Sequence, residues 1–358
     1  MGSTRNTDDS EAGGSIAAAV ADERPDGDEL PSEPTERLSW VRVAAIVAIV
    51  GLVAAGFAFA GKRLTADDEL LDRSWSVPYV DVTLTPTYQF QNPQSNPARD
   101  IALAFVVADP DEPCDPSWGG AYSLDDAARD LELDRRITQL RAAGGDIMVS
   151  FGGQANSELA FVCTDDADLA SAYRSVVERY DLHAIDLDIE NADIADTPSI
   201  ERRAQAVATV QAERAAAGDE LDVWLTLPAS RSGLTDDGVA LVTATIDGGV
   251  DLTGVNLMTM NFGSADEPTS DMLAATKAAL EAAVGQVADI YRGQGVALAD
   301  SERWTKLGAT PMIGQNDVIG EVFTLDDAKG LADFAMAKGL GRVSTWSLNR
   351  DAPCSASF

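Results

Sequence analysis

A short stretch of the chain places three carboxyl groups on one face of a predicted strand. Residues 184–190 read Ala-Ile-Asp-Leu-Asp-Ile-Glu, in which apolar and acidic residues alternate with the period of two that is typical of a β-strand. Asp186, Asp188 and Glu190 therefore point to the same side, about 6.6 Å apart at about 3.3 Å per residue. Because crowded carboxylates repel one another, at least one of them should keep its proton near neutral pH. General acid catalysis needs such a protonated carboxyl group beside an ionised one.

Two other interpretations of this strand compete with catalysis, namely a solvated edge strand and a calcium site. An edge strand would rarely place Ile185, Leu187 and Ile189 on its other face, where three large apolar side chains need cover. Calcium-binding loops usually carry glycine and irregular ligand spacing, whereas these carboxylates recur at every second residue. The pattern therefore favours a catalytic strand.

The composition disfavours several classes of partner and several kinds of catalytic site. The 358-residue chain has a formal net charge of −33 at pH 7, which disfavours nucleic acid and anionic membrane surfaces as partners and suits a neutral or cationic substrate. His183 is the only histidine, so a histidine-rich zinc site and a Ser-His-Asp triad are disfavoured. Carboxylates are the acid and base groups that remain, and we expect no metal or organic cofactor.

The three cysteines are Cys114, Cys163 and Cys354, and the absence of a C-x-x-C pair excludes a zinc ribbon. Cys114 and Cys163 both follow predicted strands at the same end of the expected fold and could form one disulfide, which would leave Cys354 over. Their spacing alone is equally compatible with three unpaired thiols.

The N-terminal part of the chain is predicted to be a tail followed by a membrane segment. In residues 1–40 acidic residues far outnumber basic ones, which predicts a disordered acidic tail. Residues 41–63 contain an uncharged apolar run that, at about 1.5 Å per residue, just reaches across a hydrocarbon core of about 30 Å. We therefore expect a single-pass anchor in the cell membrane, with the tail inside and the folded domain outside the cytoplasm. Ala58-Phe59-Ala60 also fits a signal-peptidase site, and cleavage after Ala60 would give a secreted protein.

A predicted linker of residues 64–77 precedes the predicted folded domain of residues 78–352. In this domain apolar, β-rich runs alternate with helix-like stretches. The eight runs cover residues 79–85, 101–108, 146–152, 184–190, 222–228, 254–262, 306–313 and 342–348. The helix-like stretches cover residues 124–143, 166–180, 199–217, 235–247, 270–294 and 325–338. Eight strands that alternate with helices predict an α/β fold of the (β/α)₈ TIM barrel type; a doubly wound sheet, which commonly stops at five or six strands, is the alternative.

Functional residues of such a barrel lie at the C-terminal ends of its strands, and the unusual residues of this chain fall there. The third run ends in Ser150-Phe151-Gly152-Gly153, and the fourth ends in Glu190. The sixth holds Met258-Thr259-Met260-Asn261-Phe262, the seventh leads to Gln315, and the eighth carries Trp346. We therefore expect these residues to meet at one end of the domain.

These motifs, in this order, resemble those of glycoside hydrolase family 18, the chitinases and related endo-β-N-acetylglucosaminidases. The Ser-x-Gly-Gly strand end at 150–153, the Asp-x-Asp-x-Glu strand at 186–190 and the tryptophan at 346 match in residue type and strand order. Residues 310–317 and 346–351 are similar to a bacterial and archaeal branch of the family. The resemblance covers about residues 78–351, which is the whole predicted barrel.

The resemblance implies substrate-assisted, retaining hydrolysis of β-1,4 linkages next to N-acetylglucosamine. Glu190 would protonate the glycosidic oxygen, and the substrate's own acetamido oxygen would attack the anomeric carbon. Asp188 would orient the acetamido N–H, and Asp186 would share a proton or a hydrogen bond with Asp188. The implied partner is a chitin-like polysaccharide that contains N-acetylglucosamine; chitin, peptidoglycan and N-glycans all meet this requirement. The implied substrate-binding residues are Ser150, Gly152, Gly153, Met258, Met260, Asn261, Gln315 and Trp346.

Three departures from the family pattern keep other functions open. His183 stands where the family has its first signature aspartate, and strand parity points it away from the acidic row. Met260 replaces a tyrosine whose hydroxyl binds the acetamido group, and Asn261 replaces an aspartate. The alternatives are a non-hydrolytic, lectin-like protein on the same barrel, which the presence of Glu190 disfavours, and a surface scaffold whose acidic tail is the active part.

Overall fold

The computed structural model describes residues 76–94 and 96–351, which all belong to a compact unit of residues 70–358. The predicted tail (1–40), the predicted membrane segment (41–63) and most of the linker (64–75) lie outside the described residues. Within the described part of the chain, no helix is long and apolar enough to cross a membrane.

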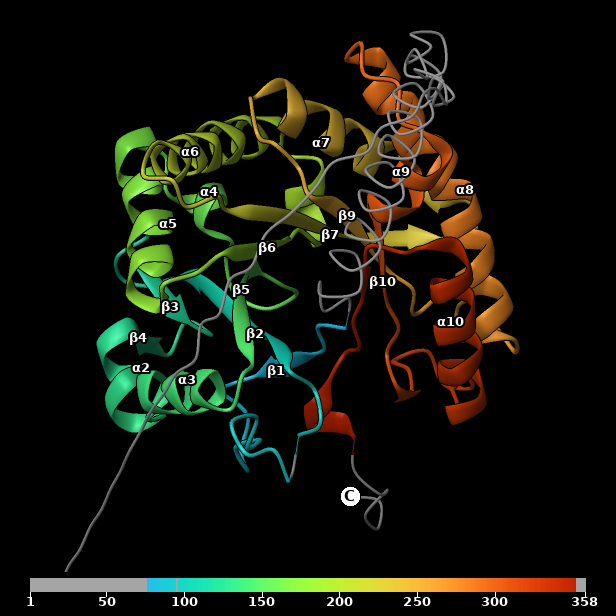
Figure 1. Ribbon diagram of the computed structural model, residues 1–358, viewed down its shortest axis with the longest axis horizontal. Helices are drawn as coiled ribbons and strands as arrows, with labels where there is room; N and C mark the ends of the chain where they lie inside the picture. The colour runs from blue at the N-terminus through green and yellow to red at the C-terminus, as the bar shows by residue number, and fades with distance from the viewer. Residues whose placement is uncertain (1–75, 95, 352–358) are drawn as a thin grey trace, which may run out of the picture. The chain divides into compact units, whose positions relative to one another are not determined.

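Eight parallel strands form the centre of the described unit, and Figure 1 shows helices to their left, above them and to their right. Each strand pairs in parallel with the next of the eight along the chain. In addition, the chain before and at the start of the first strand pairs with the end of the last strand and the residues after it: Val77 N donates to Val343 O and Tyr79 N donates to Thr345 O, both at 3.0 Å. The first strand therefore has hydrogen-bonded neighbours on both sides. The eight strands are β1 (Tyr79–Asp81), β2 (Asp100–Ala108), β5 (Asp146–Gly152), β6 (Ala184–Asp188), β7 (Asp222–Ser230), β9 (Gly254–Met258), β10 (Leu307–Thr310) and β13 (Arg342–Val343).

Short antiparallel strands pair with the C-terminal ends of two of the parallel strands. β3 (Pro116–Trp118) pairs with the end of β2 and with β4 (Tyr122–Ser123), and β8 (Gly233–Leu234) pairs with the end of β7. β11 (Gly314–Gln315) and β12 (Val322–Phe323) form a separate hairpin. The sheet is therefore mixed, and the predicted α/β class is confirmed.

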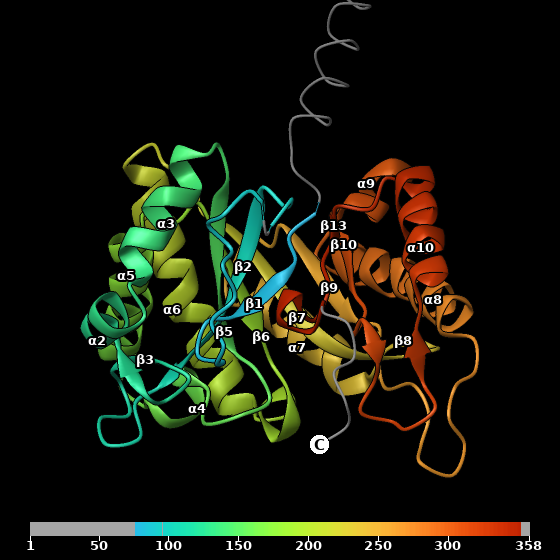
Figure 2. The same ribbon diagram turned by 90° about the horizontal axis from the view of Figure 1, so that it is seen from below.

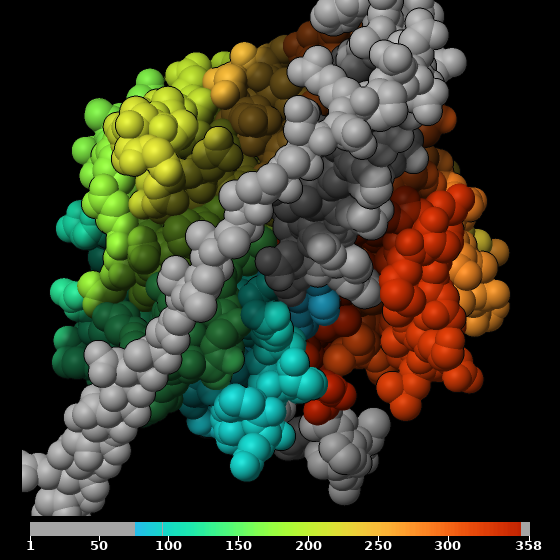
Figure 3. Space-filling model, in the orientation of Figure 1, coloured from blue at the N-terminus to red at the C-terminus, as the bar shows by residue number. Residues whose placement is uncertain are grey.

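The helices cover the strands and agree closely with the apolar periodicity of the sequence. α5 and α10 have the predicted bounds, but the expected helix over 124–143 is two helices, because Glu132 between them has φ 51° in the left-handed region. The two views place α5 and α6 on one side of the strands and α8 and α10 on the other (Figures 1 and 2), and α10 forms an edge of the space-filling view (Figure 3). The helices are α2 (Leu124–Asp130), α3 (Leu133–Ala142), α4 (Leu159–Val162), α5 (Asp166–Tyr180), α6 (Thr197–Ala216), α7 (Asp236–Asp247), α8 (Met272–Gly293), α9 (Asp300–Thr305) and α10 (Leu325–Lys338), with 3₁₀ turns at Asn191–Ile194 and Leu348–Arg350.

Apolar side chains fill both faces of the sheet. Ile185, Leu187 and Ile189 of the acidic strand are buried in the large cluster beneath the helices. A smaller cluster, which includes Tyr79 and Trp224, lies on the opposite face. Burial of each large aliphatic side chain stabilises the fold by about 1.5–3 kcal/mol. The alternation of the strand therefore leaves Asp186 and Asp188 on the second face.

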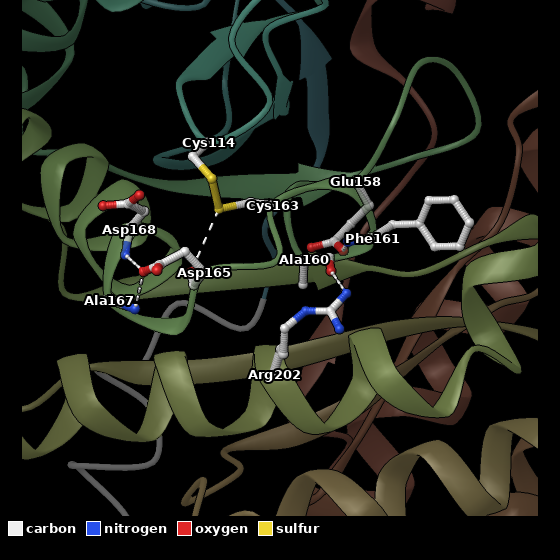
Figure 4. The surroundings of a disulfide bond; sticks show 9 residues. All are labelled: Cys114, Glu158, Ala160, Phe161, Cys163, Asp165, Ala167, Asp168 and Arg202. Atoms are coloured by element: carbon white, nitrogen blue, oxygen red, sulfur yellow. Dashed lines mark hydrogen bonds between the residues drawn. A yellow bond between two sulfur atoms is a disulfide. The ribbon is translucent and has the colours of Figure 1, made fainter.

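A disulfide joins Cys114, in the loop after β2, to Cys163, at the end of α4, with a Cα–Cα distance of 4.7 Å (Figure 4). Arg202 of α6 donates to the carbonyl oxygen of Ala160 at 2.7 Å and ties the same short helix to α6. Cys354 lies outside the described residues. The connection after β5 is therefore fixed to the loop after β2 and to α6.

Candidate active site

A cavity of about 140 Å³ lies at the C-terminal ends of the parallel strands. Of the residues predicted from the sequence, Asp188, Glu190, Met258, Met260, Asn261 and Trp346 line this cavity. Asp186, Ser150, Gly152, Gly153 and Gln315 are not among its lining residues. The other lining residues are Tyr79, Phe105, Gln154, Thr226, Thr310, Met312 and Asp317.

Asp186 lies fully buried and accepts four hydrogen bonds. Its Oδ1 accepts from Arg342 at 2.7 Å and from Thr226 at 2.6 Å, and its Oδ2 accepts from the hydroxyl groups of Tyr79 and Ser150, each at 2.7 Å. A carboxylate has about four acceptor positions, so these four donors fill its capacity. No hydrogen bond joins Asp186 to Asp188 among the described residues, and the expected sharing of a proton between them stays a prediction.

Asp188 has a different environment from Asp186. It is 4% exposed, and its Oδ1 has no hydrogen-bond partner among the described residues. Burial raises the pKa of Asp188 well above its usual range; the negative charges of Glu190 and Asp186 raise the pKa further, and the Arg342 guanidinium opposes them. A buried carboxylate oxygen that faces a cavity without a partner is available to accept a hydrogen bond from a ligand.

Glu190 lies two residues after the end of β6 in extended conformation, and its side chain lines the cavity. Burial, together with the charge of Asp317, raises the pKa of Glu190 from 4.5 to about 7. Glu190 therefore retains a proton over much of the neutral range. Because Asp188 and Glu190 repel each other and both pKa values are raised, the two groups titrate as a coupled pair.

Asn261 connects the end of β9 to the hairpin of β11 and β12. It has φ 52°, a conformation in which asparagine is several-fold enriched. Its Nδ2 donates to Asp317 Oδ2 at 3.0 Å, and its Oδ1 accepts from the backbone N–H of Asp317 at 3.1 Å. Gln315 donates only to backbone carbonyl oxygens of the same hairpin, between 2.9 and 3.1 Å. The structure therefore brings Asp317, rather than Gln315, to the cavity.

Ser150, Gly152 and Gly153 support the acidic strand instead of lining the cavity. Ser150 donates to Asp186, as described above. A Cβ on Gly152, which has φ +100°, would lie 2.2 Å from the carbonyl oxygen of Asp188, and a Cβ on Gly153 would lie 2.8 Å from the Phe105 ring. Both glycines are therefore required by close packing between β5, β6 and Phe105. Neither glycine lines the cavity, and their expected role in substrate binding stays a prediction.

Part of the cavity lining is aromatic or apolar. The rings of Trp346 and Phe105 stack with centroids 5.3 Å apart and an interplanar angle of 25°. Met258, Met260 and Met312 line the same cavity, so Met260 occupies the position expected for it but offers no hydroxyl group. An aromatic surface beside carboxylates suits a ring that carries apolar C–H faces and polar substituents, as a sugar does.

Sequence analysis missed several residues that contact the acidic strand. Tyr79, Thr226 and Arg342 donate to Asp186 from β1, β7 and β13. The position of Arg342 carried no distinct signal, because the run over 306–313 also begins with a cation, Lys306. His183 lies exposed, with Nδ1 3.0 Å from Asp219 Oδ1, as the strand parity predicted. Within residues 76–94 and 96–351, no group of three or more His, Cys, Asp or Glu side chains is placed to hold a metal ion.

Residues 77–312 match the sequence profile of "Glycosyl hydrolases family 18". The chain belongs to this family. It is 38% identical over 280 residues to a "Probable bifunctional chitinase/lysozyme" of Escherichia coli (strain K12) and 36% identical over 280 residues to "Endochitinase 11" of Metarhizium anisopliae. Each match covers 77% of this chain, but only 31% and 52%, respectively, of the length of these relatives.

The fold agrees with this membership. The crystal structure of the catalytic domain of hyperthermophilic chitinase from Pyrococcus furiosus is similar with a TM-score of 0.67 and 28% sequence identity. The similarity covers 78% of this chain and 85% of that chain. The cavity described above is thus the candidate active site of a family 18 member.

Proposed function

We propose that this chain is a chitinase-type glycoside hydrolase that cleaves β-1,4 linkages next to N-acetylglucosamine. The family membership and the chitinase-named relatives support a glycosidase. The single observation that carries the mechanism is the pairing of two carboxyl groups in one cavity: Glu190 with a pKa of about 7, and Asp188 with an oxygen that has no partner among the described residues. One can supply a proton while the other bears a charge.

In the proposed reaction Glu190 donates its proton to the glycosidic oxygen as the bond to the anomeric carbon breaks. The carbonyl oxygen of the substrate's 2-acetamido group attacks that carbon and forms an oxazolinium ion. Asp188 accepts a hydrogen bond from the acetamido N–H and stabilises the developing positive charge. Glu190, now ionised, then takes a proton from the water that opens the ring, so the configuration is retained.

The fold around this site is proposed to be a closed (β/α)₈ barrel. The hydrogen bonds from Val77 to Val343 and from Tyr79 to Thr345 support closure between the first and last strands. The position of the cavity at the C-terminal ends of the strands fits this architecture. The proposal also assigns Trp346 as the floor of the sugar subsite and leaves the acetamido group against methionine side chains.

The experiment compares the full chain with its Glu190→Gln variant on N-acetylglucosamine oligomers and on oligomers of the same length without acetamido groups. We expect the parent to cleave only the acetylated substrate, and the variant to lose about 10²–10⁴-fold in turnover. Glu281→Gln, which changes an exposed carboxylate on α8, is the matched control and should act like the parent. Binding without turnover in both parent and variant would establish the lectin-like alternative instead.

We also propose that residues 41–63 anchor the chain in the cell membrane with the catalytic unit outside the cytoplasm. The support is the uncharged run over 43–61 in the sequence. Carbonate extraction of membranes from expressing cells, with protease added to intact cells, tests both parts. Release of the chain into the soluble fraction, or protection from the protease, would contradict the anchor or its orientation.

A further inference from the structure

A guanidinium group lies inside the sheet beside the catalytic strand. Arg342, the first residue of β13, is 1% exposed. One of its terminal nitrogens lies 2.7 Å from Asp186 Oδ1, and its Nε donates to Ser344 Oγ at 2.8 Å. The guanidinium also lies 5.2 Å from the centre of the Tyr79 ring. A cation at this depth costs desolvation energy, so the arrangement needs a reason beyond filling space.

The charges around Arg342 suggest that reason. Asp186, Asp188 and Glu190 form one row on β6 and at its end, and a single buried cation contacts only the first of them. Asp186 is thereby supplied with a counter-charge in addition to three hydroxyl donors. Without the counter-charge, the row would hold three mutually repelling carboxyl groups in a buried space and would take up a further proton.

We infer that Arg342 is a positioning residue of the reaction: by keeping Asp186 as a carboxylate, it confines the proton of the acidic row to the Asp188–Glu190 pair. This inference rests on the function proposed above. The reaction can start only when Asp188 is ionised and Glu190 is protonated. A proton on Asp186 would disturb this state, because it would either be taken from the Asp188–Glu190 pair or be added to the row as an extra proton. Arg342 thus acts by contact on Asp186 and through its charge on Asp188, and it is not among the residues that line the cavity.

The groups that set the charge of the pair come from several elements. Asp186 acts from β6 and Arg342 from β13, while Asp317 acts on Glu190 from the hairpin of β11 and β12. Tyr79, from β1, donates to Asp186 and lines the cavity. Removing the positive charge of Arg342 makes every carboxyl group in the row bind protons more tightly. Both limbs of the pH–rate profile should therefore move to higher pH.

The test measures kcat/KM against pH for the full chain and for the variants Arg342→Met and Arg342→Lys. Arg342→Met should shift both limbs upward, by less than the about 1–3 units that an opposite charge in contact with a carboxyl group causes, because Arg342 contacts Asp186 and not the Asp188–Glu190 pair. Arg342→Lys keeps the positive charge, so its pH–rate profile should be close to that of the parent. Arg203→Met is the matched control, because Arg203 is also buried and pairs with Glu158 at 3.0 Å, outside the cavity. This control should lose stability without a shift of either limb.

Two further measurements test the role of Arg342 if the Arg342→Met variant is poorly folded or the parent is inactive on the oligomers. Asp186→Asn removes the negative charge that Arg342 is said to maintain, so both limbs should move to lower pH. The loss of Tm in Arg342→Met should also grow from pH 4 to pH 8, because the uncompensated Asp186 carboxylate costs more when it is ionised. Unmoved limbs in an active parent, or a Tm loss that is the same at every pH, would reduce Arg342 to a packing role. If the parent is inactive but the Tm loss of Arg342→Met still grows with pH, the result contradicts the proposed function and leaves the inference about Arg342 intact.

Discussion

The charge of Asp317 should set the alkaline limit of activity. Asp317 lines the cavity at the tip of the hairpin that Asn261 holds, and its negative charge contributes to the raised pKa of Glu190. Asp317→Asn removes this charge but keeps an oxygen that can accept from Asn261 Nδ2. With one negative neighbour fewer, Glu190 binds its proton less tightly, so its pKa falls. The basic limb of kcat/KM should therefore move to lower pH.

The size of this effect follows from the pKa of Glu190. The rise from 4.5 to about 7 spans about 2.5 units (7 − 4.5), with burial as the larger cause and Asp317 as the second. Less than half of the rise is therefore lost in Asp317→Asn, which gives a shift of at most about one unit. Asp317 is exposed, so added salt should shrink the shift further.

The assay is a pH series on a chromogenic N-acetylglucosamine oligomer at low and high ionic strength. Asp168→Asn, an exposed aspartate on α5, is the matched control and should leave the basic limb in place. A basic limb that stays fixed in Asp317→Asn, or that moves to higher pH, would refute the electrostatic role of Asp317.

Three other outcomes follow from the structure. Trp346→Ala should raise KM for N-acetylglucosamine oligomers by about tenfold with a smaller change in kcat, because the stacked floor beside Phe105 is lost; an unchanged KM would remove Trp346 from the subsite. Replacing both Cys114 and Cys163 by serine should lower Tm, since a crosslink across 49 positions is worth about 4 kcal/mol at most; equal Tm values with and without the crosslink would contradict this. The net charge of −33 should make Tm rise between about 0.05 M and 1 M sodium chloride as screening relieves self-repulsion, and a flat dependence would show that repulsion is unimportant.

The sequence predicted those parts of the site that depend on local periodicity. The alternation over 184–190 correctly placed Asp186 and Asp188 on one face of β6 and Ile185 and Leu187 on the other. Apolar periods of 3.6 residues likewise located the helices, and α5 agreed in both bounds. These features are set within a few residues of one another, so a single sequence contains them.

The partners of the acidic strand depend instead on contacts between distant segments. Tyr79 lies 107 positions from Asp186, and Arg342 lies 156 positions from it, yet both donate to its carboxylate. Local patterns carry no information on such pairings. The same limit explains Ser150 and Gln315, whose polar side chains suited a sugar but bind Asp186 and the hairpin carbonyl groups. The break at Glu132 was missed although the apolar spacing changes phase there: Leu124, Ala127 and Leu131 follow one helical spacing, and Leu133, Ile137 and Leu140 start another.

The most direct test of the central claim, that Glu190 is the general acid, varies the leaving group. The full chain and Glu190→Gln are compared by kcat/KM on an N-acetylglucosamine oligomer and on a dinitrophenyl glycoside of the N-acetylglucosamine disaccharide, whose leaving group needs no proton. If Glu190 protonates the leaving oxygen, the variant should lose about 10²–10⁴-fold on the oligomer and far less on the dinitrophenyl substrate. An equal loss on both substrates would contradict this role.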